Sequence, residues 1–224
     1  MRVVLASNNA KKLAELRELL GGLAVELVPE GALGIAEAEE PHDTFLENAL
    51  AKARHAARAC GGAAVADDSG LCVPALGGEP GVHSAVFAGD VGEGGRSGAA
   101  GALGEDREGR RRRQDAANNA LLLRRLAELG DASGAPARSA YFACTLVALR
   151  HAADPEPLVA TGRWAGTVLG APRGEGGFGY DPLLFIPSLG ATVAELASGA
   201  KNRVSHRAQA ARALRELLVS VWKV

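Results

Sequence analysis

The sequence predicts a globular protein of the mixed α/β class, because apolar, strand-like runs alternate along it with segments of helical periodicity. Its 224 residues are 47% hydrophobic and carry a formal net charge of −1, which excludes a chain too polar and too charged to fold. Glycine is abundant, with 29 residues, yet no Gly-X-Y period runs through the sequence, so a collagen-like fibre is also excluded. We therefore expect one domain, or one bilobed domain, with a sizeable core.

The chain opens with a predicted strand, a polar turn and a helix. Arg2–Ala6 is a short apolar run, and Ser7-Asn8-Asn9 follow it directly. Apolar residues then recur at helical spacing until Gly21-Gly22 ends the pattern: Leu13, Leu16, Leu19 and Leu20. A turn before a helix offers free backbone N–H groups and the positive end of the helix dipole to an anion, and Lys12 adds a positive charge. The alternative is an ordinary helix cap with solvated lysines.

A second helix is predicted to begin after Thr44, because Thr44 and Glu47 form a capping box. The apolar run Ala63–Ala66 predicts a buried strand that ends at Asp67-Asp68-Ser69-Gly70. Two adjacent carboxylates are poor core residues but suit a hard cation such as Mg²⁺, although a plain acidic turn is the alternative. Glu39-Glu40, just before the second helix, either supplies another metal ligand or is a solvated face.

The segment 89–113 predicts a mobile loop, because it is rich in glycine and arginine and has almost no large apolar side chain. A helix carrying Leu121, Leu122, Leu126 and Leu129 is expected after it. Three strands and two capped helix starts are expected in the second half of the chain: Tyr141–Leu149, Leu158–Leu169, Phe178–Ile186, Thr192 and Ser205.

A cluster of glycines surrounds an aromatic residue over residues 176–182, with the sequence Gly-Gly-Phe-Gly-Tyr-Asp-Pro. Such glycines let the backbone approach a flat ligand on which Phe178 can stack, although a hairpin with Phe178 in the core is the alternative. Lys201, His206 and Arg207 lie near a helix start, where positive charge is unfavourable with the helix dipole. They therefore indicate a site for an anion or a base carbonyl, or else they are surface bases beside a capped helix.

Several function classes lack their sequence signals. Gly174-x-Gly176-x-x-Gly179 resembles a dinucleotide-binding loop, but a strand rather than a helix is predicted after it. Arg110–Arg113 lies among acidic residues without aromatic neighbours, so a solvated run is favoured over a nucleic-acid patch. The sequence contains no zinc-ligand spacing, P-loop, GxSxG motif, signal peptide or apolar run long enough to span a membrane. The three cysteines are widely spaced without a CxxC pair, which favours a reducing compartment.

Five motifs in this order together resemble the inosine-triphosphate pyrophosphatase family, whose members hydrolyse deaminated purine nucleoside triphosphates. The motifs are Ser7-x-Asn9-x-x-Lys12, Thr44-Phe45-x-x-Asn48-Ala49, Asp67–Leu71, Gly177–Pro182 and Ser205-His206-Arg207. The resemblance covers nearly the whole chain. It implies an α/β fold with a mixed elongated sheet, flanking helices and two lobes around a central nucleotide cleft, in a single bilobed domain over residues 1–224. It also implies a cytoplasmic homodimer that binds a small-molecule nucleotide and neither nucleic acid nor membranes.

The same resemblance implies Mg²⁺-dependent conversion of ITP, dITP and XTP to the monophosphate and pyrophosphate. It gives Asp68 the roles of general base and metal contact, and it makes Glu40 the other carboxylate near Mg²⁺. The residues that it assigns to the phosphates are Ser7, Asn8, Asn9, Ala10, Lys11, Lys12 and Lys201. The residues that it assigns to the nucleoside and its 6-oxo base are Ser69, Phe178, Gly179, Tyr180, Asp181, His206 and Arg207.

Two other functions stay open from the residues alone. A pyrophosphatase of related fold that acts on pyrimidine or modified triphosphates needs similar acidic residues, although the Ser-His-Arg and Phe-Gly-Tyr-Asp motifs favour a purine. A non-catalytic module that binds nucleotides or nucleic acid is the other alternative, and it depends on the arginine run and the anion-ready turns.

Overall fold

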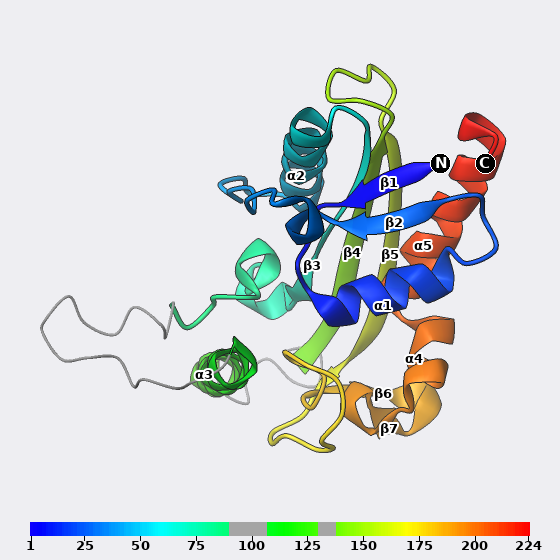
Figure 1. Ribbon diagram of the computed structural model, residues 1–224. Coiled ribbons are helices and arrows are strands. Elements are labelled where there is room, and N and C mark those ends of the chain that lie inside the picture. The colour runs from blue at the N-terminus through cyan, green and yellow to red at the C-terminus, as the bar shows by residue number, and fades with distance from the viewer. Residues whose placement is uncertain (90–106, 130–137) are drawn as a thin grey trace, which may run out of the picture. The chain divides into compact units, whose positions relative to one another are not determined.

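The computed structural model describes residues 1–89, 107–129 and 138–224 (Figure 1). Within these residues the strands form a seven-stranded sheet in the order β2-β1-β3-β4-β5-β6-β7. The first strands pair in parallel, β1 with β2 and β3, whereas β6 pairs antiparallel with β5 and β7. The sheet is therefore mixed and carries helices beside it, which confirms the predicted α/β class.

The strands and helices have the following bounds. The strands are β1 (Arg2–Leu5), β2 (Glu26–Pro29), β3 (Ala63–Cys72), β4 (Ser139–Leu149), β5 (Leu158–Val168), β6 (Leu184–Ile186) and β7 (Ala191–Thr192). The helices are α1 (Ala10–Leu19), α2 (Phe45–Cys60), α3 (Arg107–Glu128), α4 (Ser198–Val204) and α5 (His206–Leu217), with short 3-10 turns between some elements. No helix in the described part of the chain has both the length and the apolar character needed to cross a bilayer.

The chain divides into two compact units. The first unit consists of Met1–Ser69, Ala143–Trp164 and Lys201–Val224. The second unit consists of Gly70–Phe142 and Ala165–Ala200, of which 90–106 and 130–137 lie outside the described residues. β3, β4 and β5 contribute residues to both units.

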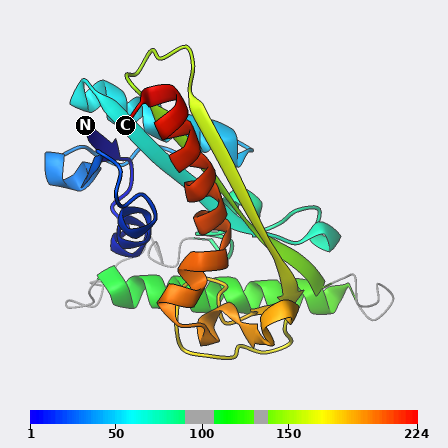
Figure 2. The ribbon, with the colours of Figure 1, turned by 90° about the vertical axis from the view of Figure 1, so that its right-hand side faces the viewer.

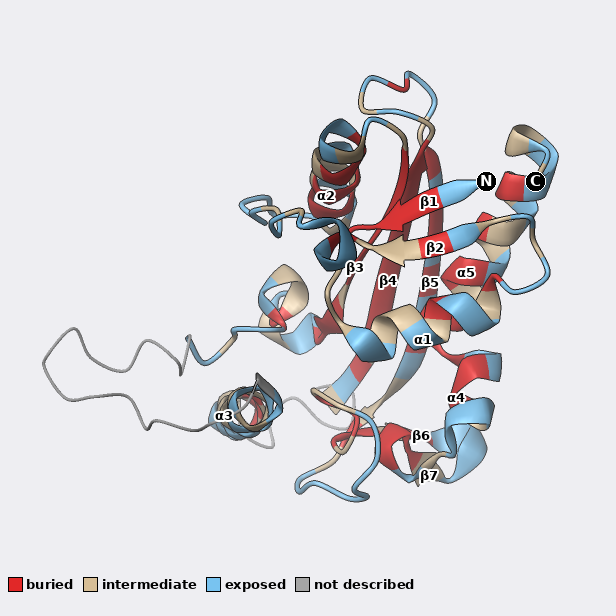
Figure 3. Ribbon diagram, in the orientation of Figure 1, coloured by how far each residue is buried: buried red, intermediate tan, exposed pale blue. Residues whose placement is uncertain are grey.

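Alternation along the strands gives the first unit a core on each face of its sheet. Val3, Leu5 and Val65 belong to a buried cluster with residues of α1 and α5. Val4 and Ala64 belong to a separate buried cluster with the alanines of α2. Figure 3 shows the resulting buried stretches of β1, β3 and β4, and Figure 2 shows α5 in front of the strands. Successive side chains of a strand point to opposite faces of the sheet. Whether a residue of β3 has an odd or an even number therefore decides which helices its side chain faces.

Side-chain caps begin α2 and α5, as the sequence predicts. The Thr44 hydroxyl accepts a hydrogen bond from the Glu47 N–H at the start of α2. The Ser205 hydroxyl accepts one from the Ala208 N–H at the start of α5. Such caps satisfy donors that a helix N-terminus would otherwise leave unpaired.

In the second unit, Thr192 and Glu195 form the predicted capping box. The helix that the leucine spacing predicts is α3, and its Leu122 and Leu126 are buried. The strands expected at Tyr141–Leu149 and Leu158–Leu169 correspond to β4 and β5.

The prediction that β3 ends at the acidic pair is wrong. The strand continues through Asp67 and Asp68 to Cys72, and both carboxylates are buried within it. The strand can pass through them because each carboxylate has a cationic partner inside the fold. Beyond them, the Leu71 N–H donates to the Ser84 hydroxyl.

The strand expected over Phe178–Ile186 is also largely wrong, since only Leu184–Ile186 is extended as β6. The preceding residues form turns because Gly177 and Gly179 have positive φ angles of 74° and 60°. The Asp181 carboxylate accepts from the Phe178 N–H at 2.9 Å and so closes the turn.

The mobile loop expected over residues 89–113 is wrong at its C-terminal end. Residues 90–106 lie outside the described part, but Arg107 begins α3. The stretch Arg107–Arg113 contains one glycine among residues of good helix propensity, so it continues into the leucine-bearing helix. Arg110–Arg113 are exposed on that helix, and Arg112 pairs with Glu108.

Candidate active site

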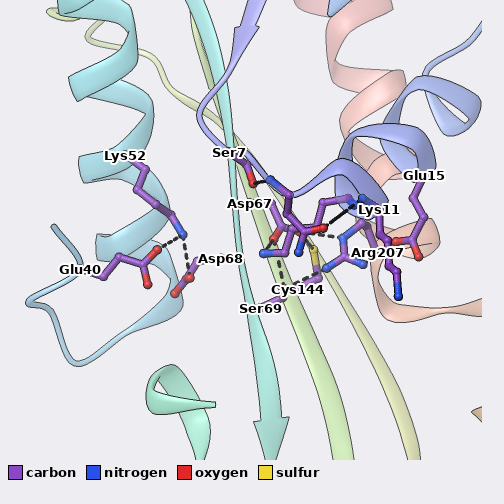
Figure 4. A network of polar contacts seen from close by, with 12 residues as sticks. Ser7, Lys11, Glu15, Glu40, Lys52, Asp67, Asp68, Ser69, Cys144 and Arg207 are labelled. Atoms are coloured by element: carbon purple, nitrogen blue, oxygen red, sulfur yellow. Dashed lines mark hydrogen bonds and ion pairs between the residues drawn. The ribbon is translucent and has the colours of Figure 1, made fainter. Parts of the chain in front are cut away.

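The two neighbouring aspartates of β3 lie on opposite faces of the sheet (Figure 4). Asp67 lies on the same face of β3 as Val65, toward α1 and α5, whereas Asp68 lies on the same face as Ala64, toward α2. The pair therefore organises two separate polar clusters in the first unit rather than one acidic site.

Asp67 is the centre of the first cluster, and its side chain is 0% exposed. Its Oδ1 pairs with the Lys12 ammonium and accepts from the Ser69 hydroxyl at 3.1 Å. Its Oδ2 accepts from Arg207 Nε at 2.9 Å and from the Cys144 thiol at 3.2 Å. Burial alone raises the pKa of Asp67, but the Arg207 guanidinium and the Lys12 ammonium hold it well below its usual range. Asp67 is therefore an ionised internal anchor.

Glu15 extends this cluster from α1. Its Oε2 pairs with Arg207 Nη1 at 2.5 Å, and its Oε1 lies 3.7 Å from Lys201 Nζ. Arg207 Nη2 donates to the Ser69 hydroxyl at 3.0 Å. Two carboxylates thus hold three cationic side chains, those of Lys12, Lys201 and Arg207, in one place.

His206 is buried next to this cluster at the start of α5. Burial, with a smaller contribution from the Arg207 charge, holds the pKa of its imidazole well below its usual range. His206 is therefore neutral at physiological pH, so it can present both a donor and an acceptor nitrogen.

Asp68 forms the second cluster with Lys52 of α2 and Glu40. Lys52 Nζ lies 2.9 Å from Asp68 Oδ1 and 2.7 Å from Glu40 Oε1. Asp68 Oδ2 is buried and has no hydrogen-bond partner among the described residues. Burial raises the pKa of Asp68, and the Lys52 ammonium offsets that effect only in part. A buried, partly unpartnered carboxylate of raised pKa is suited to accept a proton.

The donor set of this second cluster fits a hard cation. Across the residues that the structure describes, no group of three or more His, Cys, Asp and Glu side chains could hold a metal ion. Mg²⁺, however, commonly takes only one or two protein carboxylates and keeps water and phosphate as its other ligands. Asp68 and Glu40 both pair with the single positive charge of Lys52. Asp68 Oδ2 accepts no hydrogen bond from the described residues. These two carboxylates therefore could hold Mg²⁺.

The polar turn before α1 carries more internal hydrogen bonds than the sequence predicts. The Asn9 side chain accepts from the N–H groups of Lys11 and Lys12, at 3.0 and 3.2 Å. The Ser7 hydroxyl accepts from the Asn9 N–H at 3.2 Å, and Asn8 accepts from the Gly31 N–H at 2.9 Å. The expectation of free N–H groups is therefore wrong at Asn9, Lys11 and Lys12.

The segment from Phe178 to Asp181 belongs to the second unit and forms a turn. Tyr180 and Asp181 are buried, whereas Phe178 and Gly179 are half-buried. The Tyr180 hydroxyl donates to the Ser84 carbonyl at 3.0 Å. Burial, and less strongly the Asp115 carboxylate, raise the pKa of Tyr180, so its hydroxyl stays protonated. Asp181 and Tyr180 thus have structural partners of their own inside this unit.

Sequence reasoning missed two charged side chains of the first unit's clusters, those of Lys52 and Glu15. Lys52 lies on the buried face of α2 with Ala49, Ala53 and Ala56. A lysine at helical spacing within an alanine stripe is the signal that could have identified it. Glu15 lies one helical turn after Lys12 in α1, a spacing that brings the two side chains to one face.

Comparison with known proteins places these clusters in a family. The sequence matches the Ham1 family over residues 3–217. Two relatives, from Methylibium petroleiphilum and Leptothrix cholodnii, are each 60% identical over 99% of both chains, and both are named dITP/XTP pyrophosphatase. A Burkholderia pseudomallei protein of the same name is 54% identical over 95% of this chain and 91% of its own.

Solved structures agree with the sequence comparison. The HAM1 protein of Coxiella burnetii has a TM-score of 0.82 and 38% identity, over 99% of this chain and all of its own. The Ham1 protein of Staphylococcus aureus has a TM-score of 0.75 and 32% identity, over 97% and 98% of the two chains. The resemblance drawn from the five sequence motifs is thereby confirmed. The chain belongs to the Ham1 family.

Proposed function

We propose that this protein hydrolyses deaminated purine nucleoside triphosphates, namely ITP, dITP and XTP, to the monophosphate and pyrophosphate. The relatives at 53–60% identity carry the name dITP/XTP pyrophosphatase. The single structural observation that carries the proposal is Asp68, a buried carboxylate with one unpartnered oxygen beside Lys52 and Glu40. The protein is accordingly an enzyme of nucleotide metabolism that acts on acid anhydrides.

Asp68 is the general base of this reaction. A carboxylate whose pKa is raised by burial is a stronger base than an exposed one, and the Lys52 ammonium beside Asp68 favours its ionised form. Asp68 Oδ2 takes the proton of a water molecule as that water attacks the α-phosphorus. The bond between the α-phosphorus and the bridging oxygen breaks, and pyrophosphate leaves.

Mg²⁺ is the proposed cofactor, held by Asp68 and Glu40. When bound, the ion neutralises charge on the phosphates and lowers the cost of attack by water. The chain's own contribution is to keep the two carboxylates close together through their shared contact with Lys52. Glu40 is 44% exposed, so it can reorient toward an incoming ion.

The phosphates are held by the turn Ser7–Lys12 and by Lys201. Lys12 and Lys201 supply positive charge, and the turn lies at the N-terminal end of the α1 dipole. Asp67 and Glu15 hold the two lysines in place before substrate arrives, so less ordering is needed on binding.

Recognition of the base is assigned to Ser69, His206 and Arg207 and to the turn from Phe178 to Asp181. A 6-oxo purine requires donors to O6, and those donors are left unpaired when a 6-amino purine binds instead. The imidazole of His206 is neutral. The Arg207 guanidinium donates hydrogen bonds to Asp67, Glu15 and Ser69 through its three nitrogens. Phe178 supplies an aromatic face for stacking.

The remaining proposals concern the domain organisation, oligomeric state, cellular location and binding partner of the enzyme. A single bilobed domain, a homodimer and a cytoplasmic location are implied by the family resemblance, and all three cysteines are thiols, as a reducing compartment requires. Its partner is a nucleotide rather than nucleic acid or a membrane. Sedimentation at micromolar concentration tests the homodimer, and a single species of about 23 kDa would contradict it.

A pyrophosphate-release assay tests the proposed function. Purified protein is incubated with dITP, XTP, ITP, dTTP and ATP, with Mg²⁺ and again with EDTA. We expect Mg²⁺-dependent release from the first three nucleotides and at least about a hundredfold lower kcat/KM for ATP and dTTP. Preferential turnover of dTTP would support a pyrimidine enzyme, and binding of nucleotides or nucleic acid without turnover would support a non-catalytic module.

A further inference from the structure

Helix α3 holds the Phe178–Asp181 turn through two side chains one helical turn apart. The Gly179 N–H donates to Asp115 Oδ2 at 2.8 Å. The Gly179 carbonyl accepts from Asn119 Nδ2 at 3.1 Å. Both backbone polar groups of one residue are therefore fixed by a single rigid element, because positions i and i+4 share a helix face.

The rest of the turn is fixed around this point. Gly179 has a φ of 60°, a left-handed conformation that favours glycine. The Phe178 N–H is held by the Asp181 carboxylate, and the Tyr180 hydroxyl is held by the Ser84 carbonyl. The N–H of Phe178 and both backbone polar groups of Gly179 are therefore hydrogen-bonded. These bonds leave the Cα–Cβ bond of Phe178 little freedom to change direction.

The same helix also fixes the segment that Tyr180 contacts. Asn118 Nδ2 donates to the carbonyls of Ser84 and Ala85, at 3.2 and 3.0 Å. Asn118 Oδ1 accepts from the Ala88 N–H at 2.9 Å. Three polar residues of α3, together with the buried Tyr180, thus tie two loops of the second unit to one helix.

Asn119 is held in this place at a cost in stability. Its Oδ1 is buried and has no hydrogen-bond partner among the described residues. Leaving a buried acceptor unpaired destabilises a fold, because the acceptor has lost its hydrogen bonds to water without gaining others. An apolar residue would avoid that cost at a helix position, so the benefit of Asn119 lies in its contact with Gly179.

We propose that Asp115 and Asn119 are positioning residues that set the preference for 6-oxo purines. The proposal rests on the proposed function, in which the Phe178–Asp181 turn contacts the base. Discrimination between a 6-oxo and a 6-amino purine requires donors and stacking surfaces that stay in place when the wrong base binds. Release of Gly179 from α3 lets the turn adapt to adenine, so selectivity falls while binding of the phosphates is kept.

The test compares Asp115→Ala and Asn119→Leu with two matched variants. Asp115→Asn keeps an acceptor for the Gly179 N–H, and Arg112→Ala changes an exposed residue of the same helix that pairs with Glu108. For each variant, kcat/KM is measured with dITP and dATP, along with inhibition by pyrophosphate. Hydrogen exchange of the peptide that contains Gly179 is followed by mass spectrometry.

In Asp115→Ala and Asn119→Leu we expect the dITP to dATP ratio of kcat/KM to fall by about tenfold or more. Inhibition by pyrophosphate stays within about twofold, and exchange at Gly179 becomes faster in Asp115→Ala. Asp115→Asn and Arg112→Ala keep the wild-type ratio. An unchanged dITP to dATP ratio in both Asp115→Ala and Asn119→Leu, or equal losses of kcat/KM for the two nucleotides, would overturn this proposal and leave the proposed function standing. A wild-type protein that releases no pyrophosphate from dITP would instead contradict the proposed function, and this proposal with it.

Discussion

Replacing Asp67 by asparagine tests the assignment of this residue as an internal anchor. The substitution keeps the shape of the side chain but removes its charge, and it turns one acceptor oxygen into a donor. Arg207, whose side chain is 2% exposed, then loses its buried counter-ion, and Lys12, at 18% exposure, loses its partner. The variant therefore leaves cationic groups in the fold with less compensation than before.

The expected loss of stability follows from this burial. Removing one partner of a buried ion pair typically destabilises a protein by about 3–5 kcal/mol. For a chain of this size each kcal/mol lowers Tm by about 2–4 °C, so we expect a decrease of about 6–20 °C. Asp67 has a depressed pKa in the folded state, so its contribution is present above the unfolded-state pKa of about 3.9. The difference between the two proteins should accordingly be constant at neutral pH and shrink as the pH falls below that value.

Thermal unfolding followed by circular dichroism measures this difference at several pH values. Asp43→Asn is the matched control, because Asp43 is exposed and the same change there should cost no more than about 0.5 kcal/mol. A Tm for Asp67→Asn within about 2 °C of wild type would refute the assignment of Asp67 as an ionised anchor.

The other predictions concern the base, the packing of α5 and its cap. Lys52→Met removes the charge that lowers the pKa of Asp68, so the acidic limb of the pH profile of kcat/KM should move to higher pH. An acidic limb that does not move would contradict the assignment of Asp68 as the general base. Gly162→Ala places a Cβ against the backbone of α5 and should destabilise the fold by about 1–3 kcal/mol in urea unfolding. Gly62→Ala serves as the control and should change stability little, because the Cβ there would meet only the Cys60 sulfur, at 4.0 Å. Ser205→Ala removes the cap of α5 and should cost about 1 kcal/mol, and a cost near zero would show that the cap is dispensable.

The sequence predicts most elements of the first unit because their signals are local. Thr44 and Ser205 cap helices by hydrogen bonds that span three residues, and the leucines of α1 recur at helical spacing. The motifs that contain Asp68, Ser69, His206 and Arg207 are predicted in the same way, from a few adjacent residues. Such local patterns can be read without knowledge of the fold.

The opposite faces of Asp67 and Asp68 do not follow from a strand that ends at the acidic pair, which is what the sequence predicts. Only a strand that continues to Cys72 sends neighbouring residues to opposite faces. The strand continues because Lys12, Lys52 and Arg207 neutralise the pair, and the last of these is 140 residues away in sequence. Contacts of that range leave no periodic signal.

The turn at Phe178–Asp181 differs from the predicted strand for a related reason. Aromatic and apolar residues there have strand propensity, but Gly179 is bonded to Asp115 and Asn119 of a helix about 60 residues earlier. The start of that helix was itself obscured, because the glycine-rich residues before Arg107 resemble the arginine-rich residues after it in polarity. Tertiary contacts overrode local propensity at both places.

Hydrolysis of dITP in ¹⁸O-labelled water tests the central claim most directly. Water that attacks the α-phosphorus with Asp68 as base places one ¹⁸O atom in dIMP and leaves pyrophosphate unlabelled, which mass spectrometry of both products can resolve. We predict this distribution for the wild type in Mg²⁺, and no labelled dIMP above background for Asp68→Asn. Label in pyrophosphate, release of orthophosphate, or undiminished labelling of dIMP by Asp68→Asn would contradict the account.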